Sequence, residues 1–330
     1  MLSILCYTAA ANIEYSSCHI ISVIHMKWKK VTSALDSTSE IEIKFETYRF
    51  YLESICRQLE KEYSVWRIYC NRCIEDTKSL QGLSGFDEVW VKRWMKIAWN
   101  TEYLMRENTE EYELIRFNNQ WKPIQAYYTV YAASEAVAYV LDGKYADGHQ
   151  KSMKKVTDYL SKTNLSPWNK AFKGAKGKSG NDHKPVNFPA DISIPNNLQR
   201  VDIDPVEMIA KCLKAEHKHR IDDLFFKKKG LYKYNFNPGL TGILHFLYRL
   251  RVKSNYKDVE IFVSEAPAEN IKSFSNSLEK IVLYSLTLME IILIRKCKKK
   301  FILELAKEYL KINQNADILT RRMRYYKNNI

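Results

Sequence analysis

Glycine and proline are scarce in this chain, with only 10 Gly and 8 Pro among 330 residues. All-β proteins need many turns, and turns are built largely from these two residue types. Their scarcity therefore favours long helices joined by few loops. The apolar fraction of 46% and the charged fraction of 27% are normal for a globular protein that buries a core. We expect an all-α, multi-helix bundle.

Long apolar runs and targeting signals are also absent. The most apolar segment, residues 281–294, contains Glu290 and is shorter than the roughly 20 apolar residues that a membrane-spanning helix needs. The apolar stretch Leu2–Ala11 lacks the preceding basic region of a secretory signal. We therefore expect a soluble, cytoplasmic protein with no membrane partner. Because Met26 opens a start-like Met-Lys-Trp-Lys-Lys, residues 1–25 are interpreted as an upstream extension.

Cysteine and cofactor signatures are weak. The 7 cysteines are odd in number and scattered, which argues against a disulfide framework. Only Cys70 and Cys73 form a C-x-x-C pair, and no second Cys or His pair completes a structural zinc site. His219 and Asp223 stand four apart, but a metal ion there would need ligands from elsewhere. The P-loop, dinucleotide-binding, nucleophile-elbow and zincin motifs are missing, so we predict neither a metal nor a cofactor.

Positive charge is concentrated in the second half of the chain. Residues 1–150 hold 17 Lys+Arg and 20 Asp+Glu, whereas residues 151–330 hold 35 Lys+Arg and 18 Asp+Glu. Such asymmetry indicates that one half faces a polyanion, of which nucleic acid is the commonest. The alternative is a generally basic protein in which lysine occupies solvated positions, since Lys, Asn and Ile are all abundant.

Apolar periodicity predicts a series of long helices. Residues 40–78 form an amphipathic pattern that ends near the glycines at 82 and 85, and a second helix is predicted over 87–106. Residues 123–141 are apolar nearly all round, which is typical of a helix at the centre of a domain, and Gly143 is expected to end it. A shorter helix is predicted over 148–161.

The remainder of the chain alternates a long connection with further helices. Residues 165–203 mix lysine, glycine and proline and are predicted to be a long connection. Asp204 and Pro205 are a typical N-cap and first helical residue. A helix is expected within 239–266, and one or two long helices over 268–312, followed by a basic tail. The predicted divisions are an extension (1–25), a helical region (26–118), a core (119–266) with the 165–203 insertion, and long C-terminal helices with the tail (267–330).

Two segments carry a family resemblance. The first is Tyr127-Tyr128-Thr-Val-Tyr131-Ala-Ala-Ser-Glu135-Ala, followed after a short loop by His149. The second is Tyr248-Arg249-Leu-Arg251-Val-Lys-Ser-Asn255-Tyr256-Lys-Asp258. Together they resemble the helix pair and the later helix of HEPN domains, which are all-helical modules common in bacterial toxin–antitoxin and antiphage systems. The similarity covers about residues 120–265 and implies a protein that binds, and in some members cleaves, RNA.

The resemblance implies a candidate catalytic set: Arg249, Arg251, Asn255, Tyr256 and Glu135. Ribonucleolytic HEPN domains carry an arginine followed four to six residues later by histidine, and here Asn255 stands near that place. Asparagine cannot exchange a proton near neutral pH, so the motif alone does not predict metal-independent RNA cleavage. Arginine could still hold a phosphate. Glu135 lies in an apolar context and is expected to pair with Arg249 or Arg251, because a lone buried charge is costly.

Two groups of basic residues are candidate nucleic-acid contacts: Lys170, Lys173, Lys176 and Lys178 in the connection, and Arg321, Arg322 and Arg324 in the tail. The tail also carries tyrosines, and mixtures of arginine and aromatic residues bind phosphates and stack on bases. The alternative function is a non-catalytic helical subunit that docks on an enzyme partner. Residues 281–294 would then supply the partner surface or a homo-oligomer interface, with a dimer expected.

Overall fold

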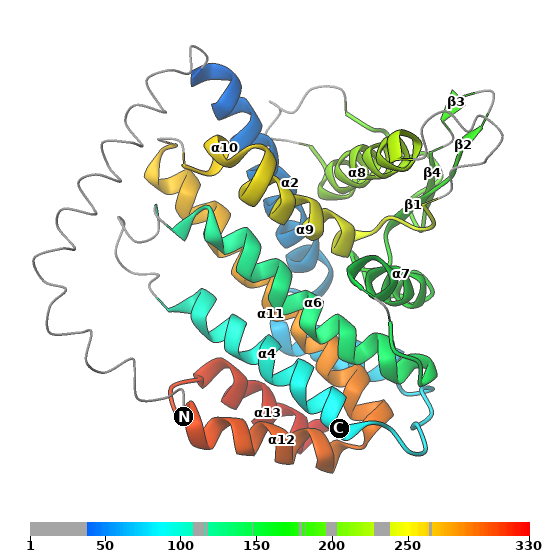
Figure 1. The fold of residues 1–330 in the computed structure, drawn as a ribbon, viewed down its shortest axis with the longest axis vertical. Coiled ribbons are helices and arrows are strands. Elements are labelled where there is room, and N and C mark those ends of the chain that lie inside the picture. The colour runs from blue at the N-terminus through cyan, green and yellow to red at the C-terminus, as the bar shows by residue number, and fades with distance from the viewer. Residues whose placement is uncertain are drawn as a thin grey trace, which may run out of the picture.

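The structure is a computed structural model that describes residues 38–107, 116, 118–146, 148–177, 180–181, 183–195, 203–227, 238–263 and 266–330. The described chain is almost entirely helical, which confirms the predicted all-α, multi-helix bundle (Figure 1). The extension predicted for residues 1–25 lies outside the described residues. No helix of the described ranges combines the length and the apolar character needed to cross a bilayer.

Helices make up most of the described chain, and two small strand pairs interrupt their order. In order they are α2 (Thr38–Tyr63), α3 (Trp66–Asp76), α4 (Glu88–Arg106), α6 (Trp121–Asp142), α7 (His149–Leu160), α8 (Pro205–Lys227), α9 (Ile243–Val252), the π-helix η2 (Lys253–Lys257), α10 (Val259–Val263), α11 (Ala268–Cys297), α12 (Lys299–Ile312) and α13 (Asp317–Asn329). The antiparallel strand pairs are β1 (Ala171–Lys173) with β4 (Lys184–Val186), and β2 (Lys176–Gly177) with β3 (Gly180–Asn181).

Helix α6 lies at the centre of the bundle and packs against both α4 and α11, which runs behind it in Figure 1. Its alanines are fully buried. Their small side chains let the neighbouring helices approach closely. The helix ends as predicted at Gly143, whose φ of 73° is the left-handed conformation that favours glycine. The amide N–H of Gly143 donates to the carbonyl oxygen of Tyr139 at 2.8 Å. The predicted central helix is therefore confirmed.

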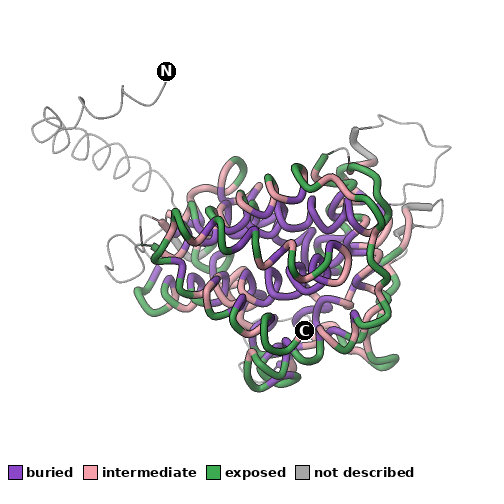
Figure 2. The backbone as a smooth tube through the Cα atoms, turned by 90° about the horizontal axis from the view of Figure 1, so that it is seen from below, coloured by how far each residue is buried: buried purple, intermediate pink, exposed green. Residues whose placement is uncertain are grey.

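Helix α11 is the second central helix, and its apolar stretch is used inside this chain. Except for Leu283, the side chains of residues 281–294 are buried, mainly against α6 and α2. Figure 2 shows this buried interior as a continuous layer. The prediction that residues 281–294 offer a partner or dimer surface is therefore wrong, because the surface is already covered. The dimer itself stays a prediction.

Two helix breaks occur where the chain has neither glycine nor proline. The predicted helix 40–78 is divided into α2 and α3 at Ser64, whose φ is 53°. Between α11 and α12 the break is at Lys298, with φ 73° and ψ 136°. The glycines at 82 and 85 lie in the loop before α4, where the Leu83 N–H donates to the Lys296 carbonyl at the end of α11.

The predicted N-cap Asp204 is confirmed, and Asp87, expected only as the start of a helix, also proves to be an N-cap. Asp87 caps α4 by accepting from the Trp90 N–H at 3.0 Å, and Asp204 caps α8 by accepting from the Val206 N–H at 2.8 Å. The Lys/Gly-rich connection folds into the two small strand pairs rather than a plain loop. The expected basic tail is also different, because it forms helix α13.

The helices share one hydrophobic core, to which all three described divisions of the chain contribute. Regions 26–118, 119–266 and 267–330 therefore do not form separate cores. Cys70 and Cys73 lie one turn apart on α3, and both are buried free thiols. The core thus brings α3, α4, α11 and α13 together, although these helices are far apart in the sequence.

Candidate functional site

Arg251 lies in a cage of tyrosines between α6 and α9. Its guanidinium carbon is 5.1 Å from the ring centre of Tyr248, 5.4 Å from Tyr127, 5.6 Å from Tyr128 and 5.7 Å from Tyr256. Each distance is within the range of a cation–π contact. Only 9% of Arg251 is exposed, and its Nε has no hydrogen-bond partner. The Nε–H of this guanidinium is thus a buried donor that no protein group accepts.

The π-helix explains why Tyr256 reaches the cage. The N–H of Asp258 donates to the carbonyl oxygen of Lys253, five residues earlier, at 3.0 Å. This wider turn brings residues five apart toward the same face, and Arg251 and Tyr256 are five apart. Tyr256 is 68% exposed and Tyr128 is 37% exposed, so these two rings of the cage lie at the surface. Short π-helical turns of this kind are frequent at functional sites.

His149, the first residue of α7, completes the cage. Its ring stacks on Tyr131 with a centroid distance of 3.9 Å, and its Nδ1 is hydrogen-bonded to the Tyr127 hydroxyl. Burial lowers the pKa of His149 below its ordinary value, and the positive charge of Arg251 lowers it further. At neutral pH the imidazole is therefore uncharged. An imidazole thus stands beside the arginine, although the α9–η2 segment itself carries asparagine at that place.

Glu135 lies next to His149 and is not paired with arginine, so the predicted ion pair with Arg249 or Arg251 is wrong. One carboxylate oxygen accepts from the Ser152 hydroxyl on α7, and the other has no hydrogen-bond partner. Burial raises the pKa of Tyr131, and the neighbouring Glu135 raises it further. Because Glu135 is only 2% exposed, this carboxylate is a buried acceptor close to Tyr131.

Arg249 points to the opposite side of α9, away from the cage. One of its N–H groups is hydrogen-bonded to His219 Nε2 on α8. The two residues line a small cavity of about 200 Å³ together with Tyr48 and Glu216. Burial raises the pKa of Glu216 to about 8, although Arg249 partly opposes the shift. The structure therefore divides the predicted catalytic set between two places, since residues two apart on a helix face different sides.

The remaining predicted contacts are scattered. Asn255 is partly exposed and makes no hydrogen bond to the cage among the described residues. The Lys170 ammonium donates to the Asn187 carbonyl and lies over the Phe188 ring, whereas Lys173 is exposed on β1. Lys176 lies on β2, and Lys178 lies outside the described residues. These lysines are therefore not shown to form one basic face.

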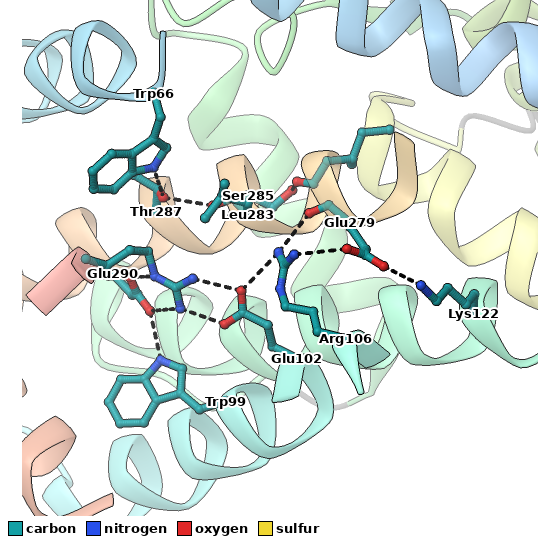
Figure 3. Close-up of polar contacts among 12 residues, drawn as sticks. Trp66, Trp99, Glu102, Arg106, Lys122, Glu279, Leu283, Ser285, Thr287 and Glu290 are labelled. Carbon is teal, nitrogen blue, oxygen red and sulfur yellow. Dashed lines mark hydrogen bonds and ion pairs between the residues drawn. The ribbon is translucent and has the colours of Figure 1, made fainter. Parts of the chain in front are cut away.

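Arg322 is in the core, so its prediction as a nucleic-acid contact is wrong. It is 1% exposed and donates to both oxygens of Glu102, at 2.8 and 2.7 Å, and to both oxygens of Glu290, at 2.9 and 3.0 Å. Trp99 and Tyr326 add hydrogen bonds to Glu290 at 2.8 Å each. Figure 3 shows the part of this network formed by Trp99 and Glu102 of α4 and Glu290 of α11. Its donors are fully used inside the protein and cannot reach a phosphate.

The arginines of this network oppose the effect of burial on the pKa values of its two carboxyl groups. Burial would raise the pKa of Glu102, but Arg322 and Arg106 outweigh it and hold the pKa below its usual value. Burial raises the pKa of Glu290, and Arg322 offsets this only in part. A connected chain runs from Arg106 through Glu279 to Lys122 (Figure 3). The network is a structural tie between helices.

Arg321 and Arg324, on either side of Arg322, point outward and are exposed. They line a groove between α3, α11 and α13 that also holds Trp66 and Tyr325. Of the tail residues predicted to contact nucleic acid, these two are therefore on the surface. The described residues hold no group of three or more His, Cys, Asp or Glu side chains arranged to bind a metal ion.

His149 is the residue of the candidate site to which sequence reasoning assigned no role. It was part of the first quoted segment, but its position beside Arg251 depends on the packing of α7 against α6 and α9, which no local pattern reveals. Comparison with protein-family models, with curated proteins and with solved structures finds no match.

Proposed function

We propose that this chain is a HEPN-like, RNA-binding protein of the bacterial defence or toxin–antitoxin type, and that RNA binds at the Arg251 cage. The observation that carries the proposal is the guanidinium of Arg251 held among four tyrosine rings, beside an uncharged histidine. The net charge of +14 adds a general attraction for polyanions.

The cage matches the two parts of a nucleotide. A planar guanidinium forms paired hydrogen bonds with phosphate oxygens. The exposed rings of Tyr128 and Tyr256 supply faces on which unpaired bases stack, a contact worth about 1–3 kcal/mol per base. Sequence-tolerant binding of single-stranded RNA is the recognition mode that uses these two elements together.

His149 gives the same site a proton acceptor. Because its pKa is lowered by burial and by Arg251, the imidazole is uncharged at pH 7 and can take a proton from a ribose 2′-hydroxyl. The 2′-oxygen would then attack the adjacent phosphorus, with Arg251 on the phosphate oxygens, and the P–O5′ bond would break without a metal ion. The products would be a 2′,3′-cyclic phosphate and a 5′-oxygen that leaves as a hydroxyl, taking its proton from the imidazolium or from water. Binding and cleavage are separate parts of the proposal and are tested separately.

The binding test is fluorescence anisotropy with a labelled single-stranded RNA of 12 nucleotides at several salt concentrations. Arg251→Ala should weaken binding at least tenfold, because a charge-assisted phosphate contact contributes about 1.5–3 kcal/mol. Arg251→Lys should recover only part of the affinity, since lysine lacks the planar fork. Arg249→Ala is the matched control, because it removes an arginine from the opposite side of α9. Equal loss in both alanine variants would refute the cage as the RNA site.

The cleavage test is incubation of end-labelled RNA with the protein in EDTA. His149→Gln should abolish strand cleavage and leave RNA affinity within about threefold, because the stacked ring contributes little charge when neutral. A wild-type protein that binds RNA through Arg251 but leaves it intact would restrict the function to binding. Cleavage that persists in His149→Gln would assign the proton transfer to another group.

A further inference from the structure

A second site lies on the other side of the bundle, in the groove between α3, α11 and α13. The groove has a volume of about 700 Å³, which is in the range of small-molecule sites. Its floor is apolar, with Leu283 of α11 and Ile318 of α13, and its walls carry Trp66, Tyr325 and arginines. Its described lining contains no carboxylate.

The two aromatic rings are fixed at their polar edges. The Trp66 indole N–H donates to the Thr287 hydroxyl at 2.9 Å, as Figure 3 shows. The Tyr325 hydroxyl donates to the Asn71 side-chain oxygen at 2.6 Å. The rings meet edge to face, with centroids 5.2 Å apart. Both rings are half-buried, so a partly exposed aromatic surface is held in place at the groove.

Three arginines in the lining have no acidic partner. Arg67, Arg321 and Arg324 are exposed, and no ion pair joins any of them to a carboxylate of the described residues. The fourth arginine of the lining, Arg322, forms ion pairs with Glu102 and Glu290, and its side chain is therefore held in place. Three free guanidinium groups around an aromatic and apolar surface form a site with a strong preference for anions.

An anion that fits this groove must also carry a flat apolar group. Inorganic phosphate would use the arginines and leave the Trp66–Tyr325 surface uncovered, whereas a fatty acid would offer only one charge to three guanidinium groups. A nucleotide supplies both parts, because its base stacks on aromatic rings and its phosphates accept from arginine. Charge complementarity and the fixed rings therefore point to the same ligand class.

We propose that this groove binds a phosphorylated aromatic base, supplied either as a free nucleoside phosphate or as the terminal nucleotide of an RNA strand. The base lies against Trp66 and Tyr325, and the phosphates lie among Arg67, Arg321 and Arg324. This site is distinct from the Arg251 cage and does not depend on the function proposed for the cage.

The test is isothermal titration calorimetry of the full chain with AMP, ATP, tripolyphosphate and a 5′-phosphorylated single-stranded RNA. Arg321→Glu/Arg324→Glu should weaken ATP binding at least tenfold. Lys307→Glu/Lys311→Glu on the exposed face of α12 changes the net charge equally and should alter affinity less than twofold. Trp66→Ala should weaken AMP and ATP binding but not tripolyphosphate binding, and Trp66→Phe, which keeps a ring, should retain most of the affinity.

The outcomes separate the two sources of the ligand. Binding of ATP that depends on Arg321 and Arg324 supports the proposal with a free nucleotide as occupant. Binding of the RNA but not of ATP, with the same dependence on these arginines and on the 5′-phosphate, supports it with a strand terminus as occupant. Failure of both ligands to bind overturns it, as does binding that both variant pairs weaken equally or tripolyphosphate binding that matches ATP.

The Arg251→Ala variant distinguishes this proposal from the one for the cage. Arg251→Ala should leave ATP affinity unchanged, because Arg251 does not line the groove. Loss of ATP binding in Arg251→Ala would place the nucleotide in the cage and overturn the proposal for the groove. Conversely, a chain that fails to bind RNA at the cage can still bind ATP through Arg321 and Arg324.

Discussion

Single residues in the interior show how burial changes proton binding. Glu216 is 5% exposed, and burial raises the pKa of its carboxyl to about 8. Arg249 and Arg220 oppose this shift, whereas Asp223 adds to it. Near neutral pH the carboxyl is therefore largely protonated in the folded protein, whereas it is ionised in the unfolded chain. Proton binding at Glu216 then links folding to pH.

The sign of this linkage gives a prediction for Glu216→Gln. A folded pKa above the unfolded value stabilises the protein below pH 4.5, and this contribution is lost as the pH rises toward 8. Glu216→Gln removes the dependence, so its stability relative to the wild type should rise between pH 5 and pH 8, by at most about 1.4 kcal/mol per pH unit. Urea denaturation across this range measures it. Glu269→Gln, at an exposed position, is the control, and parallel curves for Glu216→Gln and the wild type would contradict the assignment.

Residue roles were harder to predict than helices. Arg322 was assigned to the surface because it stands in an Arg-Arg-Met-Arg run. Leu319 and Tyr326 stand three and four residues from it on α13, and together with Met323 they form a buried apolar stripe that includes position 322. That periodicity was a usable signal. No such signal existed for His149, whose place beside Arg251 depends on which helices pack around α9. The separation of Arg249 from Arg251 did have a signal, since residues two apart on a helix face different sides.

Elements were predicted well wherever their ends carry local chemistry. Helix α6 was located by its apolar surface and by Gly143, and α8 by Asp204 and Pro205. The break at Ser64 was missed because a serine with positive φ has no sequence signature. The break at Lys298 was left open between one helix and two, for the same reason. Tertiary contacts hold both residues in conformations that their own side chains disfavour.

Lys298 is therefore a position where glycine should stabilise the protein. Its φ of 73° and ψ of 136° are disfavoured for a residue with a Cβ, and such strain costs about 1–3 kcal/mol. Lys298→Gly should raise the free energy of unfolding by roughly 1 kcal/mol, because glycine adopts this conformation freely. Thermal denaturation measures the effect. Lys300→Gly, inside α12, should instead lower stability by up to about 1 kcal/mol, and a loss of stability in Lys298→Gly would count against strain at this break.

For the whole molecule, the Arg322 network is the tie between distant parts of the sequence. It joins Glu102 of α4, Glu290 of α11 and Arg322 of α13, and all three are nearly inaccessible to solvent. Removing one member of a buried ion pair leaves an uncompensated charge and costs about 3–5 kcal/mol. The same pair contributes little relative to apolar residues of equal volume, so its effect appears when only one member is changed.

Arg322→Met should destabilise the protein by about 3–5 kcal/mol at pH 7, since two carboxylates would then share an apolar site. The loss should be smaller at pH 5, where a carboxyl that has lost its guanidinium partner is more readily protonated. Adding Glu102→Gln and Glu290→Gln should restore much of the stability. Chemical denaturation of the wild type, Arg322→Met and the triple variant measures these changes in stability. Arg321→Met, at an exposed position, is the control and should stay within about 0.5 kcal/mol of the wild type. No rescue by the two glutamines would indicate that lost packing, rather than unpaired charge, causes the defect.

The paired hydrogen bonds of Arg322 to Glu102 and Glu290 also set the rotation of α13 about its own axis. Successive residues of an α-helix are turned by about 100°. With Arg322 held toward α4 and α11, the Cα–Cβ bonds of Arg321 and Arg324 keep a fixed direction, and both residues line the groove. Rolling the helix would break four charge-assisted hydrogen bonds at once. The buried arginine thus fixes the rotation of α13. The two exposed arginines therefore lie on the groove side of the helix before any ligand binds.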